Sequence, residues 1–306
     1  MKRKCWSGIG IGFLIMGMFA GCSKNPASID VNSDDVAIQQ LIEENMDYIT
    51  SAGLDDNGAQ PMSYVQDGLG KLTAAITPIK FGRKGRFVKQ SVDIEYVDDL
   101  AIATIEFSFD GNFFVVAQDL TNPDAYGTLY KKEMKNSVTR RAIFKRVANT
   151  DRPKKNWRMK RVSGSLTVSP DTQLEFEKIT ITTTDQEYSF SNPLSFVQDL
   201  ELIPRFVPGD TVQVFVQLSL TSSRPDTVVL RYRNNQGMIR ARKSFRDDGQ
   251  GADAEANDGI YSGEWQVGQR RGIYHAFADA FDEGTIKDST APYNALVWGF
   301  TYIVKN

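Results

Sequence analysis

The spacing of apolar residues divides the chain into a short helical stretch followed by a long series of strands. Behind Ser33 or Asp34, either of which can cap a helix, apolar residues recur at helical spacing over 36–50. A weaker helical pattern, interrupted by glycines, follows over 63–76. From residue 92 the period changes from 3.6 to 2, which is typical of half-buried strands.

The first half of the chain then predicts an antiparallel meander. Asp110-Gly111 is a dipeptide favoured in tight hairpins, so we expect a turn there and a return strand over 113–116. One or two helices followed by such a meander is an α+β pattern. The expected strands of this half cover residues 92–96, 101–109, 113–116, 138–148 and 157–168.

The second half of the chain predicts short strands separated by turns, without a helical period. This pattern favours an antiparallel sandwich. The alternation of apolar and polar residues is clearest over 212–220. The other expected strands cover residues 179–181, 228–232, 274–280 and 296–304.

Three segments of the first half together resemble the cystatin-like, nuclear-transport-factor-two-like cone. They are the helix over 36–50, the segment SVDIEYVDDLAIATIEFSFDG and the closing strand NWRMKRVSGSL. The resemblance implies a curved sheet that wraps a helix and leaves a cavity. The second half resembles bacterial immunoglobulin-like or fibronectin-type modules. We therefore predict an α+β cone, with a helix packed on a curved antiparallel sheet, over 35–169, and an all-β C-terminal sandwich over 170–306.

The start of the chain has the pattern of an export signal. A basic segment at 2–4 precedes an apolar run over 9–19, which is too short to span a bilayer comfortably. The run ends in Phe19-Ala20-Gly21-Cys22, which resembles the lipobox of bacterial lipoproteins, although Phe19 stands where leucine is commonest. The resemblance implies removal of residues 1–21, a diacylglyceryl thioether on Cys22 and an acylated amine. It also makes 22–34 a tether.

The cysteine count supports acylation. After removal of 1–21 the remaining chain has one cysteine, at its first position, so no internal disulfide can form. Several acyl chains give a stable anchor, whereas one chain binds membranes only marginally. In lipoproteins of this kind Ser23 implies sorting to the outer membrane, so we expect a lipid-anchored protein of the cell envelope. The alternatives are an ordinary secretory cleavage site with an incidental cysteine, or an uncleaved anchor.

Composition removes several classes of function. The chain has 306 residues with 36 basic and 38 acidic ones, which is too balanced for a nucleic-acid partner. One histidine and two cysteines exclude a multi-histidine metal site, and no GxSxG motif is present. We expect His275 to be an ordinary strand histidine. Asp93 and Tyr96 have opposite facings on one predicted strand, so they do not form a catalytic pair. The prediction is a protein without enzymatic activity.

The segment RDDGQGADAEANDGIYSG over 246–263 is the sharpest local pattern. It resembles a loop of exported bacterial sandwich modules, and its oxygen-bearing side chains permit a calcium site, since calcium takes about 6–8 oxygen ligands. An EF-hand does not fit, because Asp258 occupies the position that requires glycine. The alternative is a structural double turn in which aspartates cap backbone N–H groups. The six candidate ligands are Asp247, Asp248, Asp253, Glu255, Asn257 and Asp258.

Residues 131–161 are strongly basic, with thirteen basic residues against two acidic ones. On two adjacent strands they predict a stripe that binds anionic lipid headgroups or polyanionic glycans. The alternative is a solvated sheet face balanced by acidic residues elsewhere. The candidate contact residues are Arg140, Arg141, Lys145, Arg146, Arg158 and Lys160.

These patterns together predict a non-catalytic envelope lipoprotein with a binding or scaffolding role. Its expected partners are the membrane, through the lipid anchor, and an envelope protein or glycan; calcium is the single cofactor considered. The alternative function is a small-ligand carrier or an enzyme that uses the cavity of the cone. A deep pocket with convergent polar groups would favour the alternative, whereas an interior filled by side chains would favour scaffolding.

Overall fold

The computed structural model describes residues 33–51, 54–56, 60–61, 75–118, 127–195, 198–219, 227–233 and 240–305. These residues belong to one compact unit that runs from Ser33 to the C terminus. The leader, Cys22 and nearly all of the helix expected over 63–76 lie outside the described residues. The described helices are α1 (Ser33–Glu44), α2 (Met46–Ile49), α3 (Pro153–Asn156) and α4 (Glu283–Lys287).

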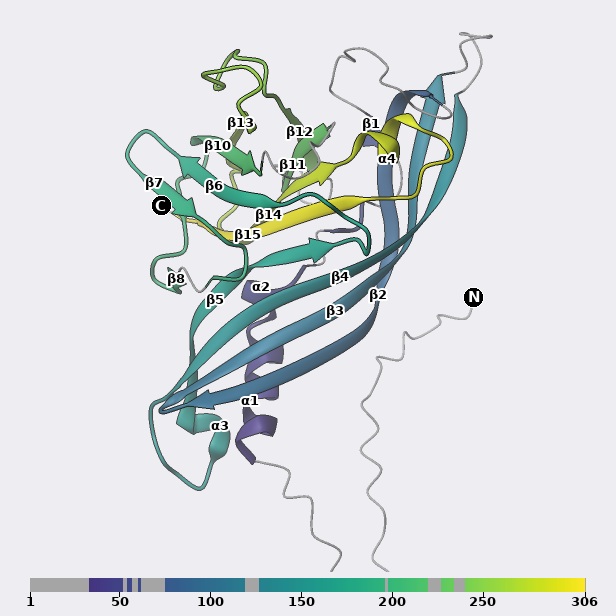
Figure 1. The fold of residues 1–306 in the computed structure, drawn as a ribbon. Helices are drawn as coiled ribbons and strands as arrows, with labels where there is room; N and C mark the ends of the chain where they lie inside the picture. The colour runs from purple at the N-terminus through teal and green to yellow at the C-terminus, as the bar shows by residue number, and fades with distance from the viewer. Residues whose placement is uncertain are drawn as a thin grey trace, which may run out of the picture. The chain divides into compact units, whose positions relative to one another are not determined.

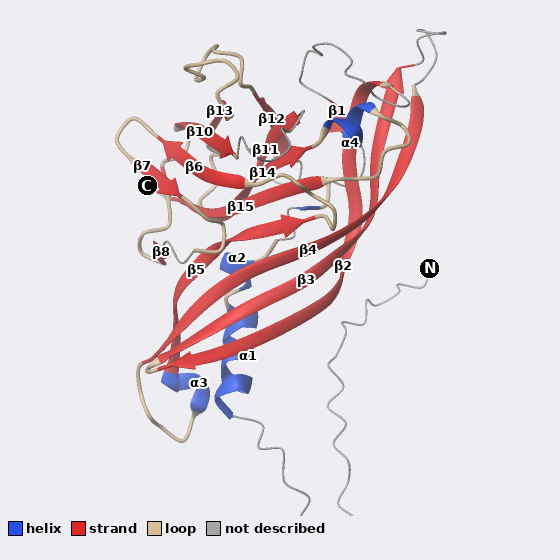
Figure 2. Ribbon diagram, viewed as in Figure 1, coloured by secondary structure: helices blue, strands red, loops and turns tan. Residues whose placement is uncertain are grey.

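Most of the unit is one large curled sheet of 11 described strands, and almost all of its pairs are antiparallel (Figures 1 and 2). Two short strands lie beside the main path: β8 (Gln198–Asp199) pairs with β5, and β9 (Arg205–Phe206) pairs in parallel with β15. The main path runs β1 (Gln60–Pro61), β2 (Thr77–Val97), β3 (Leu100–Gln118), β4 (Thr128–Arg146), β5 (Trp157–Val168), β15 (Ala295–Val304), β14 (Gly272–Phe281), β11 (Thr227–Arg233) and β12 (Arg240–Phe245).

A second sheet of four described strands packs against the C-terminal strands of the large sheet. A buried apolar cluster lies between β6, β10 and β13 on one side and β11, β14 and β15 on the other. The order of the small sheet is β13 (Ile260–Gln266), β10 (Thr211–Leu218), β6 (Phe176–Thr182) and β7 (Glu187–Phe190).

The predicted fold class, an α+β cone followed by an all-β sandwich, is wrong. The unit is mostly β, with short helices only, and a large curled sheet joins the two halves. Strand β5, which was expected to close the cone, pairs with the C-terminal strand β15, from Val168 opposite Leu296 to Ser165 opposite Gly299. The alternating patterns located most strands, but a strand's period carries no information about its partner. The pairing of residues that lie 128 to 134 positions apart was therefore not visible in the sequence.

The hairpin predicted at Asp110-Gly111 is also wrong, because both residues lie inside β3. Gly111 is opposite Gly85 of β2, and a Cβ atom at Gly111 would lie only 2.2 Å from the backbone oxygen of Lys84. The glycine is therefore used for the close approach of two long strands. Asp110-Gly111 favours a turn only where the chain reverses, and here continuous pairing with β2 and β4 overrides that preference.

The predicted helix over 36–50 forms, but it is divided at Asn45. The Asn45 side-chain amide donates to the backbone oxygen of Leu41 at 2.7 Å, at the junction of α1 and α2. Ile38 and Ile42 of α1 and Ile49 of α2 are buried in the same apolar cluster as the concave side of β3 and β4. Figure 1 shows α1 on the concave side of the long strands.

Strand β15 is buried on both faces, since it is shared by two apolar cores. Val297 contributes to the core that includes α1 and the long strands. Leu296, Trp298 and Phe300 point the other way, into the core beneath the small sheet. This double burial explains the nearly continuous apolar sequence of the strand, in contrast to the alternating pattern of a strand with one solvated face.

The curl of the large sheet brings its first long strand close to its last strands. The Arg242 guanidinium on β12 donates to the backbone oxygen of Phe81 on β2 at 2.7 Å. The rings of Phe81 and Phe281, on β2 and β14, are edge to face with centroids 5.3 Å apart. The concave side is therefore closed by contacts between strands that lie far apart in the order of the sheet.

Candidate functional site

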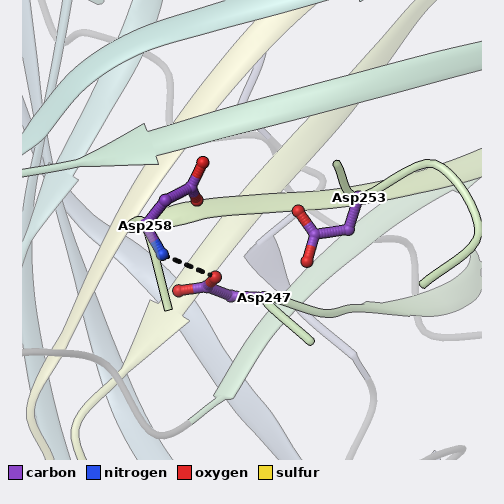
Figure 3. A group of neighbouring side chains, drawn as sticks. All are labelled: Asp247, Asp253 and Asp258. Carbon is purple, nitrogen blue, oxygen red and sulfur yellow. Dashed lines mark hydrogen bonds between the residues drawn. The ribbon is translucent and has the colours of Figure 1, made fainter. Parts of the chain in front are cut away.

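The acidic loop forms between β12 and β13. Carboxylate oxygens of Asp247, Asp253 and Asp258 lie within 4.8 Å of one another, and Figure 3 shows the three side chains converging. Asp253 is buried, whereas the other two are half-buried. Three oxygens at these separations can surround one cation of the size of calcium, whose ligands lie at 2.3–2.6 Å.

The same carboxylates also hold the backbone of the loop. Asp247 accepts from the backbone N–H groups of Asp258 and Gly259 at 3.1 and 3.0 Å, with one oxygen each. Asp253 accepts from the N–H of Gly249 at 2.6 Å, and Asp258 accepts from that of Ile260 at 2.8 Å. Gly249, Gly251 and Gly259 have positive φ. These bonds confirm the double turn that was the alternative to calcium binding.

The structure does not bring all six predicted ligands together. Asp248 accepts from the N–H of Gln250 and faces Arg246 at 3.4 Å, outside the carboxylate group. Glu255 and Asn257 are exposed and do not belong to it either. A cation held by the remaining three carboxylates would need water for about half of its coordination sphere. The three carboxylates therefore supply only part of a calcium site, and calcium binding stays an alternative interpretation of this loop.

The six predicted basic contact residues fall on different sides of the sheet. Arg141, Lys145 and Arg158 are exposed on the outer face of β4 and β5. Lys160 is exposed at a bulge of β5, next to them. The face also carries acidic partners, since Lys145 lies 3.5 Å from Asp99. The outer face therefore keeps part of the predicted stripe.

Arg140 and Arg146 are not part of that outer face. Arg140 is fully buried and donates to the backbone oxygen of Tyr48 and to the Thr301 hydroxyl, at 2.5 and 3.2 Å. Burial lowers the pKa of the Arg140 guanidinium. Arg146 pairs with Asp34 of α1 and lies over the ring of Trp157, 4.5 Å from its centroid. Both side chains attach the helical segment to the sheet. The prediction that Arg140 and Arg146 belong to the exposed stripe is therefore wrong.

His275 lies on β14 in hydrogen-bond contact with two neutral groups. Its Nε2 lies 2.9 Å from the backbone oxygen of Asp47, and its Nδ1 lies 3.1 Å from the Thr301 hydroxyl. These contacts fit the expectation of an ordinary strand histidine. Asp93 is exposed on the outer face of β2, whereas the Tyr96 hydroxyl donates to Asp35 at 2.7 Å on the concave side. The two side chains do not meet.

A chain of buried ion pairs on the concave side was not found from the sequence. Asp279 of β14 accepts from Arg83 of β2 at 2.8 Å and is held by Arg231 of β11 at 2.6 and 2.9 Å. Asp56 in turn accepts from Arg231 and from Arg242 of β12, at 2.9 and 2.6 Å. The side chains of Arg83, Arg231 and Asp279 have no exposed area. Three arginines and two aspartates thus alternate along a chain that joins β2, β14, β11 and β12 to Asp56, which precedes β1.

The ion pairs determine the protonation of their members. Burial alone would raise the pKa of Asp56, but Arg231, Arg242 and Arg83 outweigh burial and hold that pKa below its ordinary value. Burial would lower the pKa of Arg83, but Asp279, Tyr293 and Asp56 raise it above its ordinary value. Both side chains are therefore charged in the folded protein. The only sequence signal was a charged residue between apolar ones, as in Ala278-Asp279-Ala280.

The cavity at the junction of the two cores is small. It has a volume of about 30 Å³, lies where β5 and β15 separate, and is lined by Gly164, Asn192 and Thr301 among others. A single water needs roughly 10–15 Å³, so this space suits water rather than an organic ligand. Larger hollows of about 630 and 360 Å³ lie beside the acidic loop and beside Lys131 and Lys135, among exposed side chains.

A scan against protein-family models and a search of curated proteins both find no match for the chain. Among the described residues, no helix has the length and apolar character needed to cross a membrane.

Proposed function

We propose that the chain is a lipid-anchored cell-envelope protein whose folded unit binds or scaffolds other envelope components without catalysis. The anchor is the acylated Cys22, and sorting to the outer membrane follows from Ser23. The membrane is one partner, and an envelope protein or glycan is the other. The proposal for the anchor rests on the lipobox-like sequence Phe19-Ala20-Gly21-Cys22.

The observation that carries the binding or scaffolding role is the filled concave side of the large sheet. A carrier or an enzyme of the cone type would hold its ligand there. Instead the rings of Phe81, Phe113 and Phe281 pack with centroids 5.3 to 5.8 Å apart. The ion-paired arginines lie beside them, with Arg83 4.9 Å from the centroid of Phe281. This packing supports a rigid unit that presents its outer surface to partners.

The arrangement of His275 gives further support. A general base needs a reacting proton within hydrogen-bond reach, and both ring nitrogens of His275 already face groups of the protein. Two carboxylates on the concave side, Asp56 and Asp279, are each held by two arginines. Charged, doubly paired carboxylates are poor proton acceptors.

Metabolic labelling of the full chain with palmitate, followed by membrane fractionation, tests the anchor. We expect the wild type to incorporate label and to sediment with outer membranes. Cys22→Ser should lose the label and become soluble or remain unprocessed. Cys5→Ser is the matched control, because it removes the other cysteine of the chain and should leave labelling unchanged. A wild type that takes up no palmitate would contradict the proposal.

A further inference from the structure

The outer edge of β2 is a long stretch of strand without a described partner. β2 pairs with β3 along its whole length, whereas β1 covers its other side at Lys80 and Phe81 only. Arg83 is the last residue of that side with a described backbone bond, from the N–H of Asp56. Within the described part of the chain, residues 84–97 thus form an open edge. Such an edge is a template for pairing with another strand.

The charges along this edge are divided into a basic and an acidic half. Lys84 and Arg86 lie in the first half, and Asp93 and Glu95 lie in the second. All four side chains are exposed, and no ion pair involves them among the described residues. A protected edge carries charges that repel any approaching strand. A strand with opposite charges at its two ends instead attracts an antiparallel copy of itself.

We propose that two copies of this chain associate by antiparallel pairing of β2 with β2, which joins their large sheets into one. The twofold axis passes through Gln90, which lies opposite Gln90 of the second copy, and Val88 of each copy is left without a directly opposite residue. This register places Lys84 opposite Glu95 of the second copy, and Arg86 opposite Asp93 of the second copy. Symmetry repeats both pairs, so four ion pairs cross the junction. Opposite charges directly across an antiparallel pair stabilise it, and like charges destabilise it.

A bulge in β2 makes this register compatible with the faces of the sheet. The pairing of β2 with β3 shifts between Phe87 and Lys89, so that Val88 is an additional residue. Lys84 and Arg86 before the bulge and Asp93 and Glu95 after it therefore all point to the outer face. Residues directly opposite in an antiparallel pair share a face. Without the bulge, residues of even and odd number would point to opposite faces and the charges would not meet.

The inner face of the junction is apolar in the same register. Phe87, which is 39% exposed, lies opposite Val92 of the second copy. Gly85 lies opposite Ile94 of the second copy, where the missing side chain leaves room for the isoleucine. A shift of two residues in either direction breaks both kinds of ion pair and forms only one other, Arg86 with Glu95 or Lys84 with Asp93. The charges and the apolar residues thus select one register.

Charge exchange in the full chain, purified in detergent, tests the proposal by sedimentation velocity. We expect a dimer for the wild type. Lys84→Glu/Arg86→Glu and, separately, Asp93→Lys/Glu95→Lys should each raise the dissociation constant at least about tenfold. The fourfold variant that combines them should restore the dimer. Lys178→Glu/Lys243→Glu is the matched control, since it reverses two exposed lysines on other strands and should leave the dimer intact.

A monomeric wild type, or a dimer that is unaffected by either reversal, would overturn the proposal. Thermal melting of each variant shows whether it is folded. For a variant that does not fold, cysteine pairs in the otherwise native chain replace it. In membranes treated with an oxidant, Lys84→Cys/Glu95→Cys should form a disulfide-linked dimer. The control Lys84→Cys/Val97→Cys, whose cysteines are shifted by two residues from this register, should not. Cross-linking of the control alone would contradict the proposed register.

Discussion

Arg83 and Asp279, which are 196 residues apart in the sequence, form an ion pair of 2.8 Å with no exposed side-chain area. The pair joins β2 to β14 and thereby holds the curled sheet closed. A second aspartate, Asp56, continues the chain of charges to Arg242 on β12. A buried charge without a partner would destabilise the folded state by several kcal/mol, so the buried arginines need the two aspartates as counter-charges.

Removal of Asp279 should be strongly destabilising. Asp279→Asn leaves Arg83 without its carboxylate and leaves Arg231 with Asp56 alone. We expect a loss of about 3–5 kcal/mol in the free energy of unfolding, measured by urea denaturation. Arg83→Met should cost less, because Asp279 keeps its two contacts with Arg231. Equal losses of unfolding free energy in Asp279→Asn and Arg83→Met would show that the ion pairs do not hold β2 against β14.

Asp56 should make stability sensitive to acid. Its pKa is lowered in the folded state, so its contribution is present above the unfolded value of about 3.9 and is lost as pH falls through the folded value. We expect Asp56→Asn to be less stable than the wild type at pH 7, and this difference to shrink below about pH 4. Urea denaturation at a series of pH values measures it. A difference that stays constant down to pH 2 would contradict the lowered pKa.

Lys132 should make stability sensitive to alkaline pH. Its Nζ donates to the backbone oxygens of Gly284 and Asp288, both at 2.7 Å, and burial lowers its pKa to about 8. Between this value and the ordinary 10.5 the unfolded chain binds more protons than the folded one, so stability rises with pH. We therefore expect the wild type to gain stability relative to Lys132→Met between pH 8 and 10.5. If the free energies of unfolding of the wild type and Lys132→Met change in parallel over this pH range, the lowered pKa of Lys132 is contradicted.

The acidic loop should keep its shape without a cation. Asp247→Ala removes the acceptor of two backbone N–H groups, and we expect a loss of about 1–3 kcal/mol whether or not calcium is present. Calorimetric titration of the wild type with calcium should give little heat. A calcium-dependent rise in melting temperature that disappears in Asp253→Asn would instead assign a cation to the three carboxylates.

Local patterns predicted the elements of this fold better than their arrangement. The alternation over 212–220 located β10, the apolar run over 296–304 located β15, and the capped helical pattern located α1. The pairing of β5 with β15 was not predictable, because it depends on contacts between distant segments. The turn predicted at Asp110-Gly111 was wrong for the same reason, because the close packing of Gly111 against Gly85 exists only in the assembled sheet.

The candidate sites show a similar division. The caps and glycines of the acidic loop act within a few residues of one another, and that double turn was predicted. Whether a basic residue reaches the surface depends on the curvature of the sheet, and Arg140 proved to be buried. The ion pairs of Arg83, Arg231 and Arg242 join segments up to 196 residues apart, which no local pattern can reveal.

Mass spectrometry of the N-terminal peptide, prepared from native membranes, tests the central claim most directly. We predict that the mature protein starts at Cys22, with a diacylglyceryl group on its sulfur and an acyl chain on its amine. A peptide that retains residues 1–21, or one with an unmodified Cys22 thiol, would contradict lipid anchoring.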